Sequence, residues 1–468
     1  MRKKKNIVLE KLRITGYAAE GKSLARHDGK VIFVEQAVPG DVVTVRLTKD
    51  KKDWAEGQVI SFDEYASDRV KPFCPHFGIC GGCQWQMLPY EKQLQYKQDQ
   101  VLQSLTRIGK LDLPELMPII GARRTTGYRN KLEYTFSNRR YLLRSELSNP
   151  DISAMQDAAG FHARGIFDKV VDVDRCFLQE EPTNFIRKAV KQWGIEQRVP
   201  FYDINRHQGF LRTMQVRLCR TGELMVNIVL GYFDEQLVNG LMDYMLKSFP
   251  QITTLLYTIN TKQNDSLTGL EPVTYHGKGY VIEKLERFAF KIGPKSFFQT
   301  NTEQAERLYQ VTREFAELSG NETLYDLYCG TGSIGLFMSD RAKRIIGVEL
   351  IPEAIADAKE NAALNGVGHA EFLAGDVTDI CDDAFFETYG RPDVVVTDPP
   401  RAGMTEKLVN KLLDIAAKKM VYVSCNPATQ ARDLQRLSEK YEVTAIQPVD
   451  MFPHTHHIEN IARLLLKH

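Results

Sequence analysis

The stretch Asp326-Leu-Tyr-Cys-Gly330-Thr-Gly332-Ser-Ile-Gly335 indicates the fold of the C-terminal part of the chain. It begins inside an apolar run and ends in closely spaced glycines, which is typical of a strand that turns into a helix. Glycine at such a turn lets the backbone approach a ligand that a side chain would exclude. The stretch therefore predicts the first strand and the ligand-binding turn of an α/β domain.

Strand and helix signals alternate regularly around and beyond this turn. We expect strands at Thr323–Tyr328, Arg344–Val348, Ala370–Leu373, Asp393–Thr397, Met420–Ser424, Val443–Pro448 and Ile461–Leu466. Helices at Pro352–Asn365 and Glu406–Lys418 lie among the first five strands. The pattern predicts a Rossmann-like, doubly wound α/β domain over residues 291–468, with its ligands at the carboxyl ends of the parallel strands.

Acidic residues follow three of these strands and indicate a cofactor site. Glu349 ends the second strand, where a carboxylate accepts hydrogen bonds from ribose hydroxyls, and this fits NAD as well as S-adenosylmethionine. Asp376 follows the third strand, where it either meets an adenine or caps a helix. The fourth strand ends in Asp398-Pro-Pro-Arg401, which places a carboxylate before a rigid turn and resembles methyltransferases that act on planar heterocycles. S-adenosylmethionine is therefore the favoured cofactor.

A cysteine follows the fifth strand, in Val421-Tyr-Val-Ser424-Cys425-Asn426-Pro427. Most single cysteines are buried and inert, but we interpret Cys425 as a nucleophile because it shares its end of the sheet with Asp398 and is followed by Asn-Pro. A thiolate that adds to carbon 6 of uracil would make carbon 5 able to attack a sulfonium methyl group. A free thiol has a pKa near ~8.5, so stabilisation of the thiolate would help.

This reaction also needs a base to remove the proton from carbon 5. The candidate is Glu459, in Asp450-Met-Phe-Pro453-His454-Thr-His456-His457-Ile-Glu459-Asn460. Three histidines and a glutamate first suggest a metal site. We rank metal lower, because the cofactor supplies the electrophile and uracil addition needs no Lewis acid. The histidines would shape the pocket of the base, and structural roles for His454 and His456 are equally compatible with the sequence.

Two further regions precede the α/β domain. Short β-type runs separated by glycine-containing turns fill residues 1–62 and predict an OB-like barrel, a shape often used on nucleic acid. Its segments Ile14-Thr15-Gly16-Tyr17-Ala18-Ala19-Glu20-Gly21 and Val38-Pro39-Gly40-Asp41 resemble a TRAM domain. Residues 63–290 mix helix and strand signals and predict a central α+β domain, with a helix from Glu91 to Leu105 and strands within 215–230 and 255–260.

Local charge bias suits an RNA partner, although the chain as a whole has a net charge of only +1. Residues 1–60 have 13 Lys or Arg against 8 Asp or Glu. Residues 121–145 add a basic stretch with one acid, Glu133, and the cations Arg123, Arg124, Arg129, Lys131, Arg139, Arg140 and Arg144. Such an excess fits contacts with a phosphate backbone, and a solvated surface explains it equally well.

Three of the eight cysteines crowd into ten residues, as Cys74-x5-Cys80-x2-Cys83. Clustered cysteines in a cytosolic chain point to metal or catalysis more than to disulfides. A fourth ligand must come from elsewhere, and Cys176 is the nearest cysteine downstream. Four thiolates suit structural zinc or an iron–sulfur cluster, and their spacing does not separate the two.

Taken together, four motifs resemble those of the S-adenosylmethionine-dependent RNA uridine-5 methyltransferases: Ser424-Cys-Asn-Pro427, Asp398-Pro-Pro-Arg401, His457-Ile-Glu459 and Ser296-Phe-Phe298-Gln299-Thr-Asn301. The resemblance covers nearly the whole chain and implies that Cys425 is the nucleophile and Glu459 the base. It implies cofactor contacts at Gln299, Tyr328, Ser333, Glu349, Asp376 and Asp398, of which Gln299 and Asp398 also lie near the target base. Ser333 stands where relatives often have Asn. Phe297 or Phe298 would stack on the extruded base, unless both are core residues.

The resemblance also implies a [4Fe-4S] cluster on Cys74, Cys80, Cys83 and Cys176, as in the branch that modifies large-subunit ribosomal RNA, with zinc as the alternative. We therefore expect methylation of carbon 5 of a uridine in 23S ribosomal RNA. The alternatives are a tRNA uridine-5 methyltransferase, an RNA cytosine-5 methyltransferase, a dinucleotide-dependent oxidoreductase and a non-catalytic RNA-binding protein. A cytosine-5 enzyme would typically have Pro before its nucleophile, whereas Cys425 follows Ser424.

Length and composition agree with this outline. A chain of 468 residues exceeds the size of one usual core, so two or three domains are expected. Apolar residues make up 43% and charged residues 26%, as in ordinary globular proteins. No apolar run approaches the length of a membrane span, and no hydrophobic stretch follows Met1-Arg-Lys-Lys-Lys. We expect a cytoplasmic protein that acts on RNA, without a membrane and without an obligate protein partner.

Overall fold

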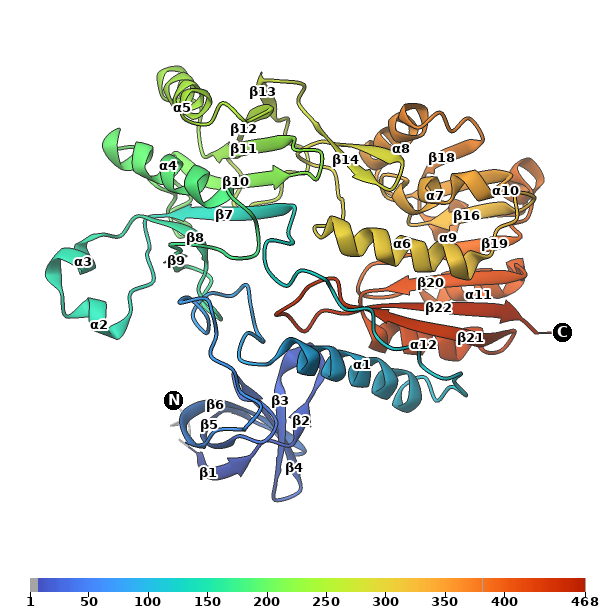
Figure 1. Cartoon of the computed structure of the whole chain (residues 1–468), viewed down its shortest axis with the longest axis horizontal. Coiled ribbons are helices and arrows are strands. Elements are labelled where there is room, and N and C mark those ends of the chain that lie inside the picture. The colour runs from blue at the N-terminus through green and yellow to red at the C-terminus, as the bar shows by residue number, and fades with distance from the viewer. Residues whose placement is uncertain (1–6, 381, 468) are drawn as a thin grey trace.

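The computed structural model describes residues 7–380 and 382–467, which form three large sheets and the helices around them (Figure 1). The N-terminal barrel lies at the bottom of the view, the central sheet at the upper left and the C-terminal sheet at the right. Helix α1 (Tyr90–Arg107) runs between the barrel and the C-terminal sheet.

The N-terminal part is a curled six-stranded sheet in the order β1-β5-β6-β4-β3-β2. Its strands are β1 (Val8–Arg13), β2 (Gly16–Tyr17), β3 (Ser23–His27), β4 (Lys30–Glu35), β5 (Val42–Asp50) and β6 (Trp54–Glu64), with a 3-10 turn, η1 (Ala19–Gly21). β1 also contacts β3 across the curl. Buried Ile14, Ile32, Val34, Val43 and Val45 fill the interior, as the alternation of apolar residues predicts. The expected β-rich N-terminal domain is confirmed.

Asp41 anchors the turn between β4 and β5. Its side chain is fully buried and accepts hydrogen bonds from the backbone N–H of Val38 at 2.7 Å and of Ala66 at 2.9 Å. Arg69 pairs with the same carboxylate at 2.7 Å. The turn is therefore tied to the chain that leaves the barrel, which fixes where that chain enters the next region.

The central region holds a seven-stranded sheet in the order β13-β12-β11-β10-β7-β8-β9. Its strands are β7 (Lys131–Ser137), β8 (Ala158–His162), β9 (Val170–Asp172), β10 (Leu211–Leu218), β11 (Leu224–Leu230), β12 (Thr254–Ile259) and β13 (Val273–His276). Helices α4 (Thr183–Glu196) and α5 (Glu235–Ser248) pack on it, and the short α2 (Arg144–Leu147) and α3 (Pro150–Ala154) lie in the β7–β8 connection. The predicted strands within 215–230 and 255–260 are confirmed.

The C-terminal domain is built on a seven-stranded sheet in the order β18-β17-β16-β19-β20-β22-β21. The strands are β16 (Thr323–Leu327), β17 (Arg344–Glu349), β18 (Ala370–Ala374), β19 (Val394–Thr397), β20 (Lys419–Ser424), β21 (Tyr441–Val449) and β22 (Glu459–Leu466). The first five in sequence are parallel, and β22 runs antiparallel between β20 and β21. All seven strands match the sequence prediction to within two residues at each end.

Helices cover both faces of this sheet, as the doubly wound pattern predicts (Figure 1). They are α6 (Thr302–Ala316), α7 (Ser333–Phe337), α8 (Pro352–Leu364), α9 (Val377–Ile380), α10 (Asp383–Tyr389), α11 (Glu406–Ile415) and α12 (Pro427–Leu437), with a 3-10 turn, η2 (Ser339–Arg341). A hairpin of β14 (Val281–Leu285) and β15 (Phe288–Ile292) precedes α6 and shares its core with both sheets.

Residues 90–120 follow the cysteine-rich loop in sequence but pack against the C-terminal sheet. Val101 and Leu105 of α1 are fully buried in the same core as α12. The backbone N–H of Met117 and of Ile120 then bond to the carbonyls of Ile446 and Pro448 at 3.1 and 3.0 Å, along the edge of β21. The sequence placed this segment within the central region 63–290 and indicated no contact with the C-terminal domain.

A buried ion pair holds α1 in this position. Lys97 Nζ lies 2.6 Å from Asp450 Oδ1, and both side chains are fully buried. The Tyr90 hydroxyl donates to the other carboxylate oxygen at 2.8 Å, and Lys97 also donates to the Phe452 carbonyl at 3.1 Å. Asp450 begins the loop that leads to β22, so α1 fixes the entry to that strand.

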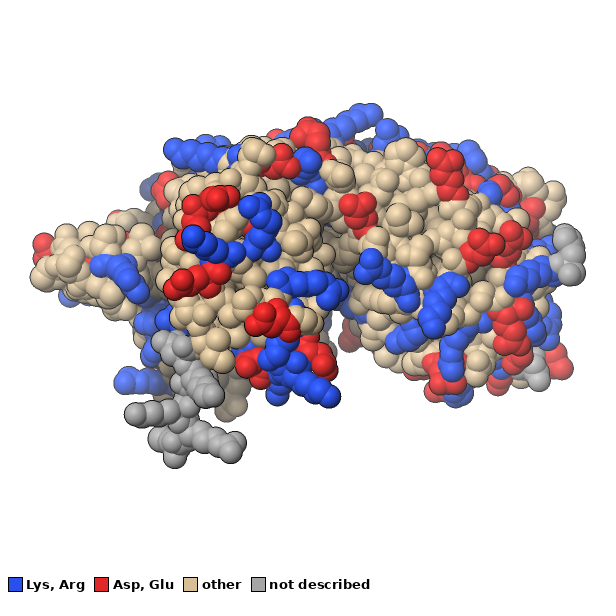
Figure 2. Space-filling view, turned by 90° about the horizontal axis from the view of Figure 1, so that it is seen from below, with Lys and Arg blue, Asp and Glu red and all other residues tan. Residues whose placement is uncertain are grey.

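The structure accounts for much of the basic bias in the sequence. Four of the 13 cations in residues 1–60 are Arg2, Lys3, Lys4 and Lys5, which lie outside the described residues and leave nine against eight acids. Figure 2 shows Lys and Arg mixed with Asp and Glu over the lower face of the molecule. In the stretch 121–145, Arg123, Arg124, Arg139 and Arg140 pair with acids. The local excess of Lys and Arg in the sequence therefore does not by itself identify an RNA-binding face.

Among the helices of residues 7–380 and 382–467, none is both long and apolar enough to span a bilayer.

Candidate functional site

The candidate site lies at one rim of the C-terminal sheet, where β16, β17, β19 and β20 end and β22 begins. β22 starts at this rim because it is antiparallel to β20. Ser424 pairs with Asn460 in that ladder, so the next position brings Cys425 opposite Glu459. Leu327 pairs with Thr397 in the β16–β19 ladder, so Tyr328 and Asp398 also lie side by side. Strand register thus assembles predicted site residues from distant parts of the sequence.

The turn after β16 uses left-handed backbone at three positions. Tyr328, Gly330 and Gly332 have φ angles of 63°, 53° and 76°. Tyr328 adopts this conformation at a cost in strain, which is common at ligand-binding turns. A Cβ on Gly330 would meet no atom within 4 Å, whereas one on Gly332 would press on Phe372 at 3.0 Å. Gly330 therefore presents bare backbone to open space, as a ligand-binding turn requires.

Two carboxylates fasten this turn. Asp326 Oδ2 accepts the Gly335 N–H at 2.8 Å, and Glu349 Oε2 accepts the Gly330 N–H at 3.3 Å. Asp326 Oδ1 is buried and has no hydrogen-bond partner among the described residues. A buried acceptor without a partner is costly, so this oxygen is a natural contact for a donor on a bound ligand.

Asp376 lies at the same side of the sheet, after β18. Its side chain is exposed and accepts the Thr378 N–H at 2.8 Å, which caps the short helix α9. The capping role considered from sequence is therefore present. The predicted contact with adenine stays a prediction.

The loop after Asp398 is tied to the loop after Cys425. Asn426 donates its side-chain N–H to the Arg401 carbonyl at 3.0 Å and caps α12 through its oxygen, which accepts the Ala428 N–H at 3.1 Å. Thr429 donates to the same carbonyl at 3.1 Å. The Asn-Pro that follows Cys425 thus begins the helix and locks the two loops together, which explains the Cys-Asn-Pro pattern.

Ionisable groups crowd around Cys425. Burial, and after it the nearby Glu459 and Asp398, raise the pKa of its thiol to about 11 against the opposing charge of Arg401. Burial and then Asp398 hold the pKa of Glu459 well above its usual range, while Arg401 lowers it. Burial raises the pKa of Asp398 to about 7. The site can therefore hold protons on groups that are ionised elsewhere at neutral pH.

Two members of this group were not predicted as site residues. Burial and then Asp398 raise the pKa of Asp326 to about 7, while the hydrogen bond from the Gly335 N–H lowers it. Tyr309 of α6 is buried, and Asp398, Asp326 and Glu459 all raise the pKa of its hydroxyl after burial. Asp326 opens the glycine-rich stretch that indicates the fold, so its position was a usable signal. Tyr309 lies on an ordinary amphipathic helix, and nothing in the sequence distinguishes it.

Of the remaining predicted residues, Ser333 directly follows the turn and Gln299 lies on the segment before α6. Ser333 begins α7 and shares a hydrogen bond of 2.9 Å with the Tyr309 hydroxyl. Gln299 is buried, and its carbonyl accepts a hydrogen bond from the Asn130 side chain at 2.9 Å. Phe298 is 3% exposed and belongs to the core, whereas Phe297 is 73% exposed. Of the two aromatic candidates, Phe297 alone is free to stack on a base.

Each of the three histidines before β22 has a partner elsewhere in the chain. His454 is buried, and its backbone N–H donates to Gln93 Oε1 at 2.8 Å. Burial lowers the pKa of the His454 ring to about 4. His456 bonds to Gln84 of the cysteine-rich loop. His457 lies 2.8 Å from the Arg401 guanidinium through Nδ1 and 4.2 Å from the His456 ring. Neutral histidines therefore support Arg401 beside the site.

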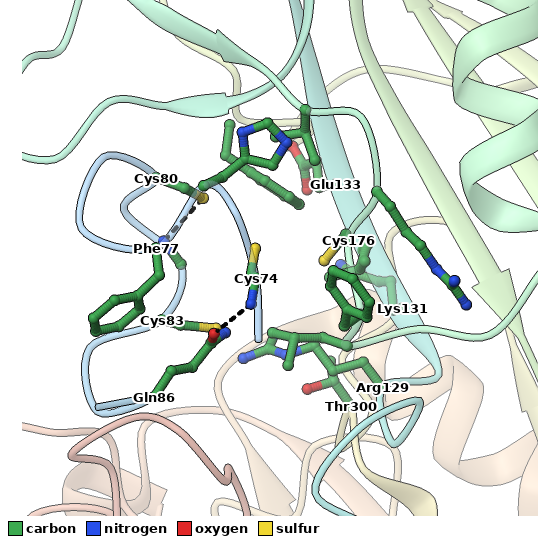
Figure 3. A pocket seen from close by; sticks show the side chains of 18 residues that line it. Cys74, Phe77, Cys80, Cys83, Gln86, Arg129, Lys131, Glu133, Cys176 and Thr300 are labelled. Atoms are coloured by element: carbon green, nitrogen blue, oxygen red, sulfur yellow. Dashed lines mark hydrogen bonds between the residues drawn. The ribbon is translucent and has the colours of Figure 1, made fainter. Parts of the chain in front are cut away.

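The four cysteines predicted as metal ligands surround one cavity of about 320 Å³ (Figure 3). Figure 3 shows the sulfur atoms of Cys74, Cys80, Cys83 and Cys176 turned toward this space. Burial raises the pKa of Cys83 to about 12 and of Cys176 to about 11. Among the described residues, no three His, Cys, Asp or Glu side chains are arranged to hold a single metal ion.

Cations line the same cavity. Arg129, Lys131 and Arg175 contribute to its walls, and Arg129 also stacks on Phe452, 5.2 Å from the ring centre. Two of them come from the basic stretch that the sequence associated with RNA. Thr300, next to Gln299, forms another part of the wall, so the cavity borders the segment that leads to the candidate site.

Comparisons with protein families agree with this geometry. A family described as tRNA (uracil-5-)-methyltransferase matches residues 276–468, and the TRAM domain family matches residues 10–60. The first match covers the whole rim, including Cys425 and Glu459.

Whole-chain relatives agree as well. A protein from Bacteroides thetaiotaomicron, described as an uncharacterized RNA methyltransferase, is 49% identical over 96% of this chain and 100% of its own length. One from Porphyromonas gingivalis with the same description is 47% identical over 97% and 99% of the two chains. Among solved structures, the Pyrococcus abyssi tRNA (uracil-54, C5)-methyltransferase, in complex with S-adenosyl-L-homocysteine, superposes with a TM-score of 0.76 at 27% identity. It covers 98% of this chain and 100% of its own.

Proposed function

The chain belongs to the RNA (uracil-5-)-methyltransferase family, and on that basis we propose that Cys425 is its nucleophile and Glu459 its base. The observation that supports these roles is the β20–β22 register, which brings the thiol opposite the carboxylate. Asp398 and Arg401 lie close enough to both groups to shift their pKa values. A nucleophile and a base on one rim, beside a ligand-binding turn, meet the needs of methylation at carbon 5.

The proposed reaction begins when the Cys425 thiol loses its proton to solvent and Sγ bonds to carbon 6 of uracil. The electrons of the 5,6 double bond move toward the carbonyl at carbon 4, so carbon 5 becomes nucleophilic. S-adenosylmethionine would supply the electrophilic methyl group that carbon 5 accepts, with cleavage of its sulfonium S–CH3 bond and release of S-adenosylhomocysteine. The Glu459 carboxylate then takes the carbon 5 proton, the double bond re-forms, and the bond between Sγ and carbon 6 breaks. Glu459 must be ionised for this step, and its raised pKa makes the ionised carboxylate a stronger proton acceptor.

Residues of the β16 turn fit S-adenosylmethionine. The open space over Gly330 admits a ligand, and the unpartnered Asp326 Oδ1 suits the amino group of its methionine part. Glu349, at the end of β17, suits the ribose hydroxyls. The proposed cofactor contacts also include Gln299, Tyr328, Asp376 and Asp398. Ser333 is a further proposed contact, and its hydroxyl shares a hydrogen bond with Tyr309.

Substrate trapping tests the two catalytic roles. RNA that contains 5-fluorouridine has no carbon 5 proton to lose, so the native protein should form a covalent adduct that survives denaturing electrophoresis. Cys425→Ala should form none and should transfer no tritiated methyl group. Glu459→Gln should accumulate an adduct with ordinary RNA, because release requires proton removal. Glu317→Gln, an exposed glutamate on the far side of the domain, should behave as the native protein does. Methyl transfer by Cys425→Ala would refute the mechanism.

We propose 23S ribosomal RNA as the target, on the resemblance of the cysteine spacing to the branch that modifies it. The Pyrococcus structure gives a specific reason to keep tRNA as the second candidate. That structure covers 98% of this chain, so the N-terminal barrel does not separate the two substrates. Mapping 5-methyluridine in the ribosomal RNA and tRNA of a deletion strain decides between them. Loss from neither RNA would refute both.

We also propose that Cys74, Cys80, Cys83 and Cys176 hold a [4Fe-4S] cluster. The four thiols line a cavity of about 320 Å³, which has room for a cluster of this kind as well as for one zinc ion with its Zn–S bonds of about 2.3 Å. Burial opposes thiolate formation in this cavity, and a bound cationic metal core would offset that cost. The guanidinium groups of Arg129 and Arg175 would balance the remaining negative charge. When bound, the cluster would join the loop of residues 74–83 to Cys176.

Metal analysis of anaerobically purified protein tests this assignment. We expect about four iron atoms per chain, little zinc and broad absorbance near ~400 nm. Stoichiometric zinc, with neither iron nor this absorbance, would contradict the cluster assignment and support the zinc alternative.

A further inference from the structure

A second polar pocket lies where three parts of the chain meet. It encloses about 420 Å³ and is lined by the η1 turn of the barrel, the cysteine-rich loop, the segment after β8, and the loops that hold Arg401 and His456. Gly21 is in contact with His456, since a Cβ on this glycine would lie 2.7 Å from the His456 Cβ. The barrel therefore forms one wall of this pocket and contacts the loop that holds His456.

Two guanidinium groups face this pocket without a carboxylate partner. Among the described residues, no Asp or Glu oxygen lies within 4.0 Å of Arg164 or Arg401, whereas neighbouring cations such as Lys22 and Arg139 are paired with acids. Arg164 donates to the Cys83 carbonyl at 3.2 Å, and Arg401 bonds to His457. Each side chain is thus oriented by a neutral partner, and its positive charge remains available to a ligand.

The surroundings favour an anion at this end of the pocket. Burial lowers the pKa of His456 to about 4, and Arg401 and Arg164 lower it too, so both charges reach the same ring. Glu20 and Glu35 lie on the barrel wall of the pocket, and Lys22 on that wall pairs with Glu56. Net positive charge is therefore concentrated on the side of Arg164 and Arg401.

The pocket is also next to the reacting groups. Arg401 lies close enough to Cys425 and Glu459 to lower the pKa of both. On the proposed function, Cys425 holds the target uracil, and consecutive phosphates of an RNA strand flank that base. A space of about 420 Å³ accepts a sugar and a phosphate.

We propose that Arg164 and Arg401 together bind one phosphodiester of single-stranded RNA beside the target uridine, in the pocket between the barrel, the cysteine-rich loop and the C-terminal domain. The two planar guanidinium groups suit bidentate contacts with phosphate oxygens. Arg164 is the positioning half of this clamp, because it holds the strand without touching the reacting atoms. The clamp rests on the proposed function and adds to it an RNA contact that spans three parts of the chain.

Salt-dependent RNA binding by the full-length, metal-loaded protein tests the clamp. The probe is a fluorescein-labelled 20-nucleotide oligouridylate, and fluorescence anisotropy gives its affinity from 50 to 300 mM salt. Arg164→Gln keeps a donor for the Cys83 carbonyl but removes the charge. We expect about three- to tenfold weaker binding and a slope of log affinity against log salt that is smaller by about 0.7. KM for RNA should rise while kcat at saturating RNA stays within about twofold.

Matched controls separate the clamp from general charge and from folding. Arg344→Gln removes a charge at the start of β17, at the opposite end of the sheet, and should leave both affinity and slope unchanged. Arg164→Lys keeps the charge and should recover most of the slope. Unchanged iron content and S-adenosylhomocysteine affinity in Arg164→Gln would show that the site and the cysteine loop are intact.

The double variant tests whether both side chains hold one phosphate. Arg164→Gln with Arg401→Gln should weaken RNA binding by less than the product of the two single effects, since one contact is lost twice. A native affinity and slope for Arg164→Gln would overturn the clamp while uridine methylation by the native protein stands. Absence of uridine methylation by the native protein would instead overturn the proposed function. The anisotropy result would still show whether Arg164 in this pocket binds RNA.

Discussion

Among single residues, the thiol of Cys425 lies at the same rim of the sheet as three carboxyl groups. Asp326, Asp398 and Glu459 come from the ends or starts of different strands, and each has a raised pKa. Burial, followed by the nearby Glu459 and Asp398, keeps the Cys425 thiol protonated at neutral pH in the protein without RNA. A protonated thiol resists oxidation and adventitious alkylation, because the thiolate is the reactive form. The positive charge of Arg401 opposes this effect and favours the thiolate when a uracil is in place.

Alkylation of Cys425 should therefore depend steeply on pH. With a pKa of about 11, the thiolate fraction and the rate of reaction with iodoacetamide should rise about tenfold per unit between pH 7 and 10. Peptide mass spectrometry measures the rate at this residue. Asp398→Asn removes a charge that raises the pKa, so it should accelerate alkylation at pH 9. A rate that levels off near pH ~9, as for a free thiol with a pKa near ~8.5, would contradict the buried-thiol description.

Among turns and helices, the β16 turn combines strain with open space. Gly330 has a left-handed φ of 53° and no atom within 4 Å of the position that a Cβ would take. Gly330→Ala should cost about 1 kcal/mol of stability through its backbone and should weaken S-adenosylhomocysteine binding at least about tenfold, because the new methyl group enters the ligand space. Isothermal titration calorimetry and thermal denaturation measure the two effects.

Gly366 provides the matched control for this turn. It follows α8 with φ 66°, is exposed, and a Cβ added to it would also meet no atom within 4 Å. Gly366→Ala should lose similar stability and keep native affinity for S-adenosylhomocysteine. Equal losses of affinity in both variants would mean that the Gly330 effect is only a loss of stability.

Helix α1 depends on its buried cation. Lys97→Met leaves the Asp450 carboxylate without its ion partner, which should reduce the free energy of unfolding by about 3–5 kcal/mol. Lys92→Met, on the same helix, removes an exposed pair with Asp68 and should cause no measurable change. Urea denaturation measures both. Equal free energies of unfolding for the two variants would contradict the role of the Lys97–Asp450 pair in holding the loop before β22.

For the molecule as a whole, the cysteine cavity joins segments that are far apart in sequence. Cys74, Cys80 and Cys83 lie in the loop before α1, and Cys176 lies in the central region. Cys176→Ser should therefore lose most of the iron and the absorbance near ~400 nm, and thermal stability should fall because the cross-link is gone. Cys219→Ala, another buried cysteine, should keep native iron content. Retention of iron in Cys176→Ser would exclude Cys176 as a ligand.

Predictions from the sequence were most successful where the signal is local. The strands of the C-terminal sheet follow from short apolar runs and from turn residues at their ends, so their bounds agree with the structure to within two residues. The capping role of Asp376 was also recognisable from its position before a helix. The sequence did not separate Phe297 from Phe298, because adjacent residues of one type differ only in what packs against them.

Long-range packing decided the rest of the candidate site. The pairing of the basic residues in 121–145 depends on acids up to about 180 positions away, such as Glu303 for Arg123. Tyr309 and Arg164 gained their roles from neighbours on other elements. No pattern within one element reports such contacts, since they arise when separate elements close on one another.

The strands of the C-terminal sheet and the glycine-rich turn after β16 could be read from the sequence, because backbone propensity and motif spacing act over a few residues, whereas the roles of Cys425 and Glu459 stay predictions. Folding in three dimensions was needed to bring Cys425 opposite Glu459, to pack α1 on the C-terminal domain, and to form the pocket that Arg401 lines together with the barrel. Strand register, burial and the pKa shifts that neighbouring groups cause depend on residues up to more than 400 positions apart. Only the folded packing decides which of these residues become neighbours.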